Sequence, residues 1–306
     1  MSIPLHQLPE QQPAVWQPVS VEEAMQLKRQ WGDASVLISG GTWLRTRWES
    51  GLAMLPKHLI SLSRIPALSG LTIDASGQLH IGPALCLADL MEHPLISQRC
   101  GVLVQACAEI AAPSVRNLAT IGGNVMTRTG DLIPVLLIMN AGLVWSDGYN
   151  ERMLPLREWL EVQQAANNEV LTKIVVPSEE ADDVLDSGSY AFYSKVGRRE
   201  AFTPSVVTVA GKLQLEGDGT VTAIALSAGG GNAVPARFFE LEEDIVGKRL
   251  SKAVLKTLHK GVSESFQAVA DDYAGAAYRK LTAANLIVSE CYKAWRKGGG
   301  ADAPQS

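Results

Sequence analysis

The sequence predicts an α+β fold in two domains, and three observations lead to this prediction. The chain has 306 residues, of which 46% are hydrophobic and 19% charged, so it can bury sizeable cores. Up to residue 178, strand-like and helix-like segments are mixed. After an acidic segment at 178–189, strands come first and helices follow, which is typical of an α+β domain. The expected divisions are a domain at 1–180 with subdomains of about 1–60 and 61–180, a domain at 187–297, and a disordered tail at 298–306.

The first domain carries clear local signals. Ser20 stands at an N-cap position with Glu23 three residues later, and apolar residues follow at helical spacing, which predicts a helix over 20–33 that ends at Gly32. The other expected elements, in order, are a short buried strand at 35–39, a strand and a short helix at 58–71, a hairpin at 71–85, an apolar helix at 101–117 broken by Pro113, a helix and a strand at 131–148, and a strand at 169–178.

The second domain is expected to hold a three-stranded sheet covered by helices. One strand is expected at 189–197, and two more at 205–230 around a Gly-Asp-Gly turn. Helices are expected at 249–269 and 277–297. The glycine cluster "AGGGNAVPAR" (228–237) is interpreted as a turn between strand and helix.

Composition excludes several classes of function. Lys plus Arg is 27 against 32 Asp plus Glu, and this net charge of -5 disfavours nucleic acid as a main partner. No apolar run approaches the roughly 20 residues that cross a bilayer, and the N-terminus does not resemble a signal peptide, so we expect a cytoplasmic protein. The four cysteines match no zinc or iron–sulfur spacing, so a redox cofactor of this chain is not expected to be a cluster.

Two glycine pairs are the main candidates for a functional site. "VLISGGTWL" (36–44) and "LATIGGNV" (118–125) both read as a buried strand ending in Gly-Gly and a small polar residue. Glycine allows close backbone approach, and successive N–H groups can form an anion-binding nest, with Thr42 or Asn124 adding a hydrogen bond. Two such loops could hold the two phosphates of a dinucleotide. The alternative is two tight turns, and neither segment matches the Rossmann or P-loop pattern.

The same segments resemble the FAD-binding subunit of molybdenum hydroxylases, the xanthine dehydrogenase and carbon monoxide dehydrogenase family. "VLISGGTWL" is similar to the family's first loop, and "IAAPSVRNLATIGGNV" (110–125) is similar to its second. The resemblance continues through "GDLIPVLLIMNAGL" and "YSKVGRREAFTPSVVTVA" and covers roughly residues 13–295. It implies a two-part FAD-binding fold of the PCMH type, like that of vanillyl-alcohol oxidase, followed by the small C-terminal domain of molybdenum-hydroxylase flavoproteins.

The resemblance also implies which residues contact FAD. In the family, both loops bind the diphosphate; here they are Leu37, Ile38, Ser39, Gly40, Gly41, Thr42, Trp43 and Leu44 in the first, and Thr120, Ile121, Gly122, Gly123 and Asn124 in the second. Four further positions match: Asp131 for the adenosine part, Lys195 near the flavin ring, Leu171 as an apolar contact and Ile110 against the isoalloxazine.

Simpler roles for these polar residues stay open in the sequence. Asp131 would also suit a helix cap, and Lys195 a solvated surface position. Arg116 is expected to brace the second loop through backbone carbonyls. Two residues depart from the family pattern: Trp43 stands where an aspartate is common, and Arg128 would either pair with a phosphate or face solvent.

The function implied by the resemblance is electron transfer by FAD within a heterotrimer. Electrons would come from a molybdenum cofactor on a large subunit through [2Fe-2S] clusters on a small subunit, and FAD would pass them to an acceptor such as NAD+. Two alternatives are a self-contained FAD oxidoreductase, which the scattered five histidines disfavour, and a scaffold subunit that has lost FAD.

Overall fold

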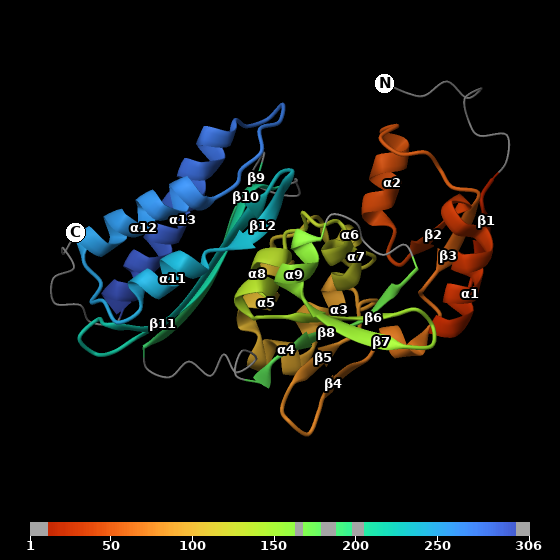
Figure 1. Cartoon of the computed structure of the whole chain (residues 1–306), viewed down its shortest axis with the longest axis horizontal. Helices are drawn as coiled ribbons and strands as arrows, with labels where there is room; N and C mark the ends of the chain where they lie inside the picture. The colour runs from red at the N-terminus through yellow and green to blue at the C-terminus, as the bar shows by residue number, and fades with distance from the viewer. Residues whose placement is uncertain (1–11, 163–167, 179–187, 198–204, 298–306) are drawn as a thin grey trace.

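The computed structural model describes residues 12–162, 168–178, 188–197 and 205–297, which form three sheets with their covering helices (Figure 1). Most of the expected acidic linker and the whole expected tail at 298–306 lie outside these residues. In the part that is described, no helix combines the length and the apolar character that a membrane crossing requires.

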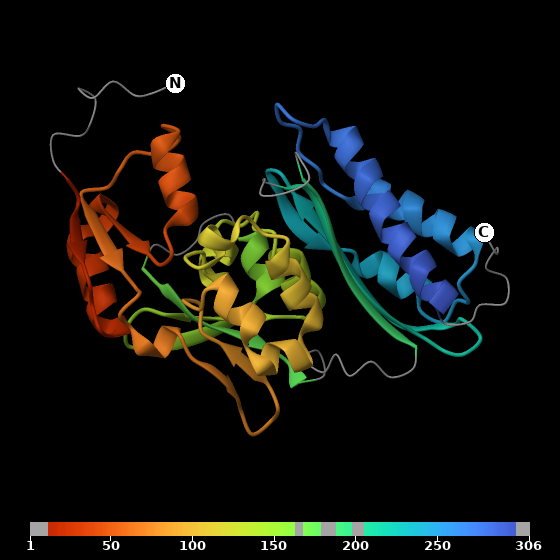
Figure 2. The same ribbon diagram turned by 180° about the vertical axis from the view of Figure 1, so that it is seen from behind.

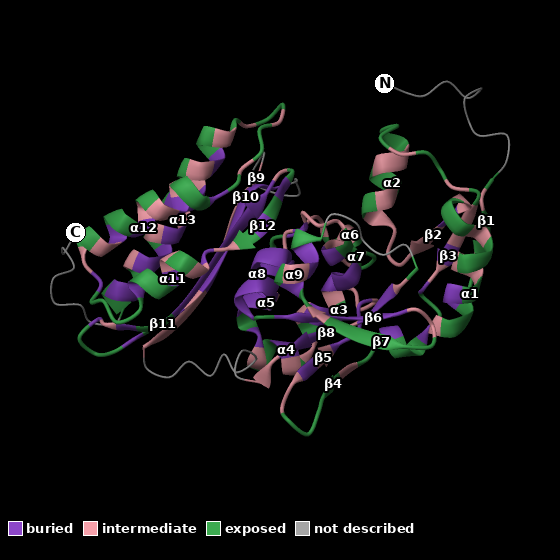
Figure 3. Cartoon of the chain, viewed as in Figure 1, coloured by how far each residue is buried: buried purple, intermediate pink, exposed green. Residues whose placement is uncertain are grey.

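The first sheet is small and parallel, with strand order β1-β3-β2. It consists of β1 (Ala14–Trp16), β2 (Ser35–Ile38) and β3 (His58–Ser61). Helix α1 (Val21–Trp31) packs against it and has the expected caps, because the Ser20 hydroxyl accepts a hydrogen bond from the Glu23 N–H and Gly32 follows with φ 47°. Helix α2 (Thr42–Glu49), which the sequence reading did not anticipate, follows β2 and buries none of its residues (Figure 3).

The second sheet has five strands in the order β4-β5-β8-β6-β7, all antiparallel to their neighbours. Its strands are β4 (Leu71–Ile73), β5 (Leu79–Ile81), β6 (Gly142–Ser146), β7 (Glu151–Pro155) and β8 (Val170–Val176). The expected hairpin at 71–85 is therefore present. The helices beside this sheet are α3 (Leu87–Glu92), α4 (Pro94–Arg99), α5 (Gly101–Ala108), α6 (Pro113–Arg116), α7 (Ile121–Met126), α8 (Ile133–Ile138) and α9 (Leu156–Glu161).

Pro113 starts a helix here and does not simply interrupt one. The expected helix at 101–117 is two helices, because α5 ends at Ala108 and the chain turns through Ala111, which has φ 47°. Pro113 then occupies the first turn of α6, where its missing N–H has no acceptor to lose.

The third sheet is antiparallel with the order β12-β11-β10-β9, so the three-stranded prediction is corrected to four. It consists of β9 (Ser189–Gly197), β10 (Ser205–Leu215), β11 (Val221–Gly230) and β12 (Ala233–Arg237). The segment 228–237 is thus the end of one strand, a turn and another strand. Gly230 and Gly231, with φ 112° and 61°, make the expected turn, but a strand and not a helix follows it.

Helix α8 joins the two halves of the molecule. All six of its residues are buried, and it packs against β10, β11 and β12 as well as the core of the second sheet (Figure 1). The other face of the third sheet is covered by α12 (Lys252–Ser265) and α13 (Ala276–Lys297), with α11 (Phe239–Ile245) at its end (Figure 2). The two long C-terminal helices are those that the sequence predicted.

Candidate cofactor site

The first glycine pair links β2 to the start of α2. Gly41 has φ 68° and is the N-cap of the helix, so it offers no side chain to cap the first turn. The N–H groups of Thr42 and Trp43 have no acceptor within the helix, because the first turn precedes the first i→i−4 bond. The start of α2 therefore presents N–H donors and the positive end of a helix dipole, which together suit an anion.

The two glycine segments lie against each other. A Cβ placed on Gly40 would be 2.7 Å from the carbonyl carbon of Leu118 and 3.2 Å from the Cα of Ala119, and it would overlap the Leu118 carbonyl oxygen. Only glycine permits this approach, since the obstacle is backbone and cannot rotate away. The tertiary structure thus brings together two segments that are about 80 residues apart in the chain.

The second glycine pair is the first turn of a helix and not a loop after a strand, which corrects the expectation. Thr120 is the N-cap of α7, and its hydroxyl accepts a hydrogen bond from the Gly123 N–H at 3.1 Å. The Gly122 N–H donates to the Pro83 carbonyl at 2.9 Å, and the Asn124 N–H donates to the Thr120 carbonyl at 2.9 Å. These N–H groups are used within the chain, so the segment supplies a side-chain-free surface and not a nest of free donors.

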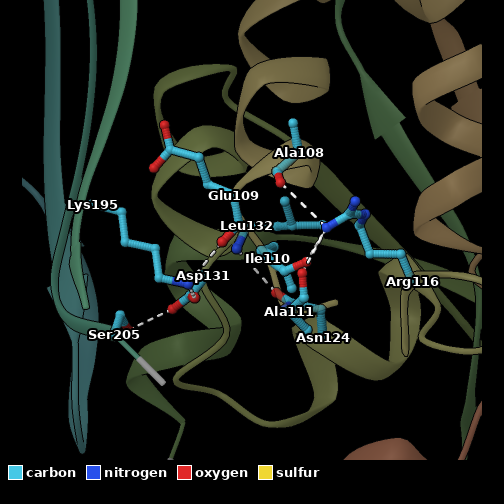
Figure 4. Close-up of polar contacts among 10 residues, drawn as sticks. All are labelled: Ala108, Glu109, Ile110, Ala111, Arg116, Asn124, Asp131, Leu132, Lys195 and Ser205. Atoms are coloured by element: carbon cyan, nitrogen blue, oxygen red, sulfur yellow. Dashed lines mark hydrogen bonds and ion pairs between the residues drawn. The ribbon is translucent and has the colours of Figure 1, made fainter. Parts of the chain in front are cut away.

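Asn124 orders the turn that carries Asp131. Its amide oxygen accepts a hydrogen bond from the Leu132 N–H at 3.0 Å (Figure 4). The Asn124 side chain also packs directly against Gly130. The Asn124 amide oxygen therefore stabilises the protein's own backbone, and the hydrogen bond that its amide N–H2 group could donate to a phosphate stays a prediction.

Asp131 and Lys195 form an ion pair between the two halves of the molecule. The Lys195 Nζ is 2.9 Å from an Asp131 carboxylate oxygen, and the two side chains are 8% and 14% exposed respectively. The same ammonium donates to the Glu109 carbonyl at 3.0 Å, and the Ser205 hydroxyl donates to Asp131 at 2.6 Å (Figure 4). Lys195 is therefore not a solvated surface lysine, and Asp131 does not cap α8 with its side chain.

The resemblance assigned Asp131 to the adenosine part of FAD and Lys195 to the flavin ring, and the structure places these two side chains in contact. Both roles stay predictions. Nearby, the phenol of Tyr193 is buried; burial, and then the charge of Asp131, raises its pKa well above the ordinary value, so it stays neutral.

Arg116 braces the second segment, as expected. Its guanidinium donates to the carbonyl oxygens of Ile110 at 3.0 Å and Ala111 at 2.6 Å, and to that of Ala108 (Figure 4). The brace holds the backbone turn at Ala111 that leads into α6.

Arg128 has a structural role that the sequence reading missed. Its guanidinium donates to the Trp159 carbonyl at 3.1 Å and to the Leu160 carbonyl, and it lies 4.6 Å from the Trp159 ring centre. These carbonyls end α9, where a cation is favoured by the helix dipole. Burial lowers the pKa of this guanidinium.

We expect Arg128→Ala to destabilise the fold by about 1–3 kcal/mol, because it removes charge-assisted hydrogen bonds to buried carbonyls. FAD affinity should stay unchanged. Urea unfolding and FAD titration check both results, with Arg157→Ala on α9 as the control, because the Arg157 side chain is 55% exposed. A loss of FAD affinity without a loss of stability would return Arg128 to the cofactor site.

The apolar residues that the resemblance predicted to contact FAD lie partly in the hydrophobic core and partly at the surface. Ile110, Ile121 and Leu171 are buried in the main hydrophobic core, and Leu37 packs against the core of the first sheet. Trp43 is 46% exposed, with the Arg47 guanidinium 4.8 Å from its ring centre. Ile38, Ser39 and Leu44 flank the Gly40–Gly41 turn.

A cavity of about 300 Å³ includes residues of α8 and α9 and none of the predicted site residues. It is lined by Leu137, Asn140, Ala141, Pro155, Leu156, Arg157 and Phe239.

Ser205 and the Glu109 carbonyl belong to the polar cluster but carried no signal in the sequence. Ser205 is one small residue at the start of a strand, and a backbone carbonyl has no sequence signature. Among the described residues, no three His, Cys, Asp or Glu side chains gather as a metal site.

Comparison with known proteins agrees with this geometry. Residues 10–179 match the family model "FAD binding domain in molybdopterin dehydrogenase", and residues 191–294 match "CO dehydrogenase flavoprotein C-terminal domain". The nicotinate dehydrogenase FAD-subunit of Eubacterium barkeri is 26% identical over 262 residues, which is 82% of this chain and 86% of that protein. The carbon monoxide dehydrogenase medium chain of Hydrogenophaga pseudoflava is 33% identical over 168 residues, 53% of this chain and 57% of that one.

Solved structures resemble the whole chain. Carbon monoxide dehydrogenase from Hydrogenophaga pseudoflava superposes with a TM-score of 0.84 and 25% identity, covering 95% of this chain and 99% of that one. Quinoline 2-oxidoreductase from Pseudomonas putida 86 has a TM-score of 0.82 at 17% identity, covers 96% of this chain and 99% of that one, and shares the fold. The predicted PCMH-type α+β fold with its C-terminal flavoprotein domain is confirmed, and the chain belongs to the family of FAD-binding domains of molybdopterin dehydrogenases.

Proposed function

We propose that this chain is the FAD-carrying, electron-transferring subunit of a molybdenum hydroxylase complex similar to xanthine dehydrogenase. The observation that carries the proposal is the uncapped start of α2 at Gly41, held against the second glycine segment through Gly40. Membership of the FAD-binding family supports the same ligand.

The residues present fit FAD. The first-turn N–H groups of α2 face no internal acceptor by helix geometry, and they would hold one phosphate oxygen or more. Gly123 on α7 is exposed and has no side chain of its own, which leaves room for close approach on the side away from the Thr120 hydroxyl. Bound FAD supplies the ability to take up electrons singly and to release a hydride.

The chain's own residues would bind and orient the cofactor. Gly41 and Thr42 would hold the diphosphate, and the Asp131–Lys195 pair would set the local charge beside it. Asn124 and Arg116 would act on the cofactor indirectly, because each holds the backbone of a neighbouring segment: Asn124 the turn at Leu132, and Arg116 the turn at Ala111. In this proposal the chain does not bind the organic substrate. The substrate pocket would belong to a large molybdenum-cofactor subunit.

Partner subunits and an acceptor complete the proposed complex. The relatives are named as an FAD-subunit and a medium chain, which supports a large molybdenum subunit and a small [2Fe-2S] subunit as partners. NAD+ is the proposed acceptor and the cytoplasm the proposed location. The division into an FAD-binding domain at 1–180 and a C-terminal domain at 187–297 is part of the same proposal.

The first experiment is the visible absorption spectrum of the purified chain, before and after FAD is added and after gel filtration. Flavin bands that stay with the protein are expected. Anaerobic NADH should then bleach them if NAD+ is the acceptor. A folded chain that retains no flavin would favour a scaffold without FAD, whereas retained flavin that NADH does not bleach would leave FAD binding intact and remove NAD+.

A further inference from the structure

The Asp131 carboxylate is held at both oxygens by the C-terminal half of the chain. The Ser205 hydroxyl donates to one oxygen at 2.6 Å, and the Lys195 ammonium is 2.9 Å from the other. Asp131 itself belongs to the segment matched by the FAD-binding family model, and its two partners belong to the segment matched by the C-terminal model. The orientation of this carboxylate therefore depends on contacts across the junction (Figure 4).

Ser205 is in turn held by a buried arginine that the cofactor site itself does not use. Arg279 on α13 is 1% exposed and forms an ion pair with Asp271 at 2.6 Å. It also donates to the carbonyl of Val206, the residue next to Ser205. The start of β10 is thus fixed to the C-terminal helix.

A second backbone contact holds Ser205. The Gly231 N–H donates to the Ser205 carbonyl at 3.1 Å. A Cβ on Gly231 would be 2.6 Å from the guanidinium carbon of Arg279, so the glycine lets the arginine fill the space beside this turn. The backbone on each side of the Ser205 side chain is therefore hydrogen-bonded. The Arg279 guanidinium holds the Val206 carbonyl, and the Gly231 turn, which packs on that guanidinium, holds the Ser205 carbonyl.

We propose that Ser205, held in place by Arg279, is a positioning residue for the cofactor site: it sets the orientation of the Asp131–Lys195 pair and so couples FAD affinity to the docking of the C-terminal domain. This inference rests on the proposed function, since it concerns the same site. It adds two residues, Ser205 and Arg279, that act through Asp131 without touching the cofactor.

The chain offers a matched control for this idea. Ser227 on β11 is also buried and also donates across the junction, to the Pro134 carbonyl at 2.7 Å, but it does not contact Asp131. Ser205→Ala and Ser227→Ala each remove one hydroxyl and one cross-junction hydrogen bond. A purely structural role predicts the same effect for both.

The test compares the FAD dissociation constants of these variants by flavin fluorescence. Ser205→Ala should raise the constant about tenfold, as expected for the loss of a hydrogen bond to a charged group. Ser227→Ala should change it less than about twofold, and Ser205→Thr, which keeps the hydroxyl, should restore affinity. Equal effects of the two alanine variants, or no rescue by threonine, would overturn the positioning role.

Hydrogen exchange in the FAD-free chain separates this inference from the proposed function. Ser205→Ala should speed amide exchange at 128–132, because the carboxylate of that turn loses one of its two anchors, whereas Ser227→Ala should leave those amides unchanged. Unchanged exchange in Ser205→Ala would contradict the inference even if the wild-type chain binds FAD. A wild-type chain that binds no FAD would refute the coupling to affinity together with the proposed function.

Discussion

Gly40→Ala is expected to abolish the retention of FAD, with a rise of about 100-fold or more in its dissociation constant. The added Cβ would overlap the Leu118 carbonyl oxygen, so the start of α2 and the second glycine segment must move apart. The backbone of Gly40 does not itself require glycine, since its φ is not positive. The effect therefore comes from the contact between segments. Overpacking of this kind costs about 1–3 kcal/mol, so the chain should still fold.

Gly70→Ala is the matched control for this variant. A Cβ at Gly70 meets no atom within 4 Å, and its φ is also not positive. Flavin absorbance after gel filtration and a fluorescence titration measure binding in both proteins, and circular dichroism measures folding. If the Gly40 variant retains FAD with normal affinity, the junction of the two glycine segments is not the cofactor site.

Breaking the Asp131–Lys195 pair is expected to have the second largest effect. Asp131→Asn or Lys195→Met alone should reduce the free energy of unfolding by about 3–5 kcal/mol, because each leaves one charge nearly buried without its partner. The double variant should be more stable than the sum of the single effects predicts, since it leaves neither charge behind. Each variant should also bind FAD more weakly than the wild type.

Urea unfolding of the four proteins gives the coupling free energy, and FAD titration of the same four measures the second effect. Lys248→Met serves as the control, because Lys248 forms an exposed i,i+4 pair with Asp244 and should contribute less than about 1 kcal/mol. Additive stability effects at Asp131 and Lys195 would mean that the pair is not coupled in solution. An unchanged FAD affinity in both single variants would place the pair outside the cofactor site.

Local signals predicted much of the fold because they involve residues close together in the chain. The capping serine and closing glycine of α1 depend on neighbours three or four residues away, and the alternating pattern of 71–85 produces its hairpin locally. The resemblance to molybdenum-hydroxylase flavoproteins rests on equally local motifs around the two glycine pairs, and it led to the correct family and fold.

The errors arose where one local pattern suits two structures. Gly122 and Gly123 read as a loop, but the Thr120 hydroxyl caps a helical turn there. The glycine run at 229–231 was expected to be a turn from a strand into a helix, but the turn connects two paired strands, with Gly230 opposite Ala233. Arg128 could not be placed from the sequence, since its acceptors at the end of α9 lie about 30 residues away.

By itself, the sequence determined the α+β class, the family, most helices and strands, and the glycine pair at the start of α2, because each is written in short-range patterns. Only the tertiary structure decided how the site is assembled. Gly40 meets Leu118 because the first sheet packs beside the second, and Asp131 meets Lys195 and Ser205 because α8 is buried against the C-terminal sheet. Such contacts depend on how whole layers pack, which no short segment specifies.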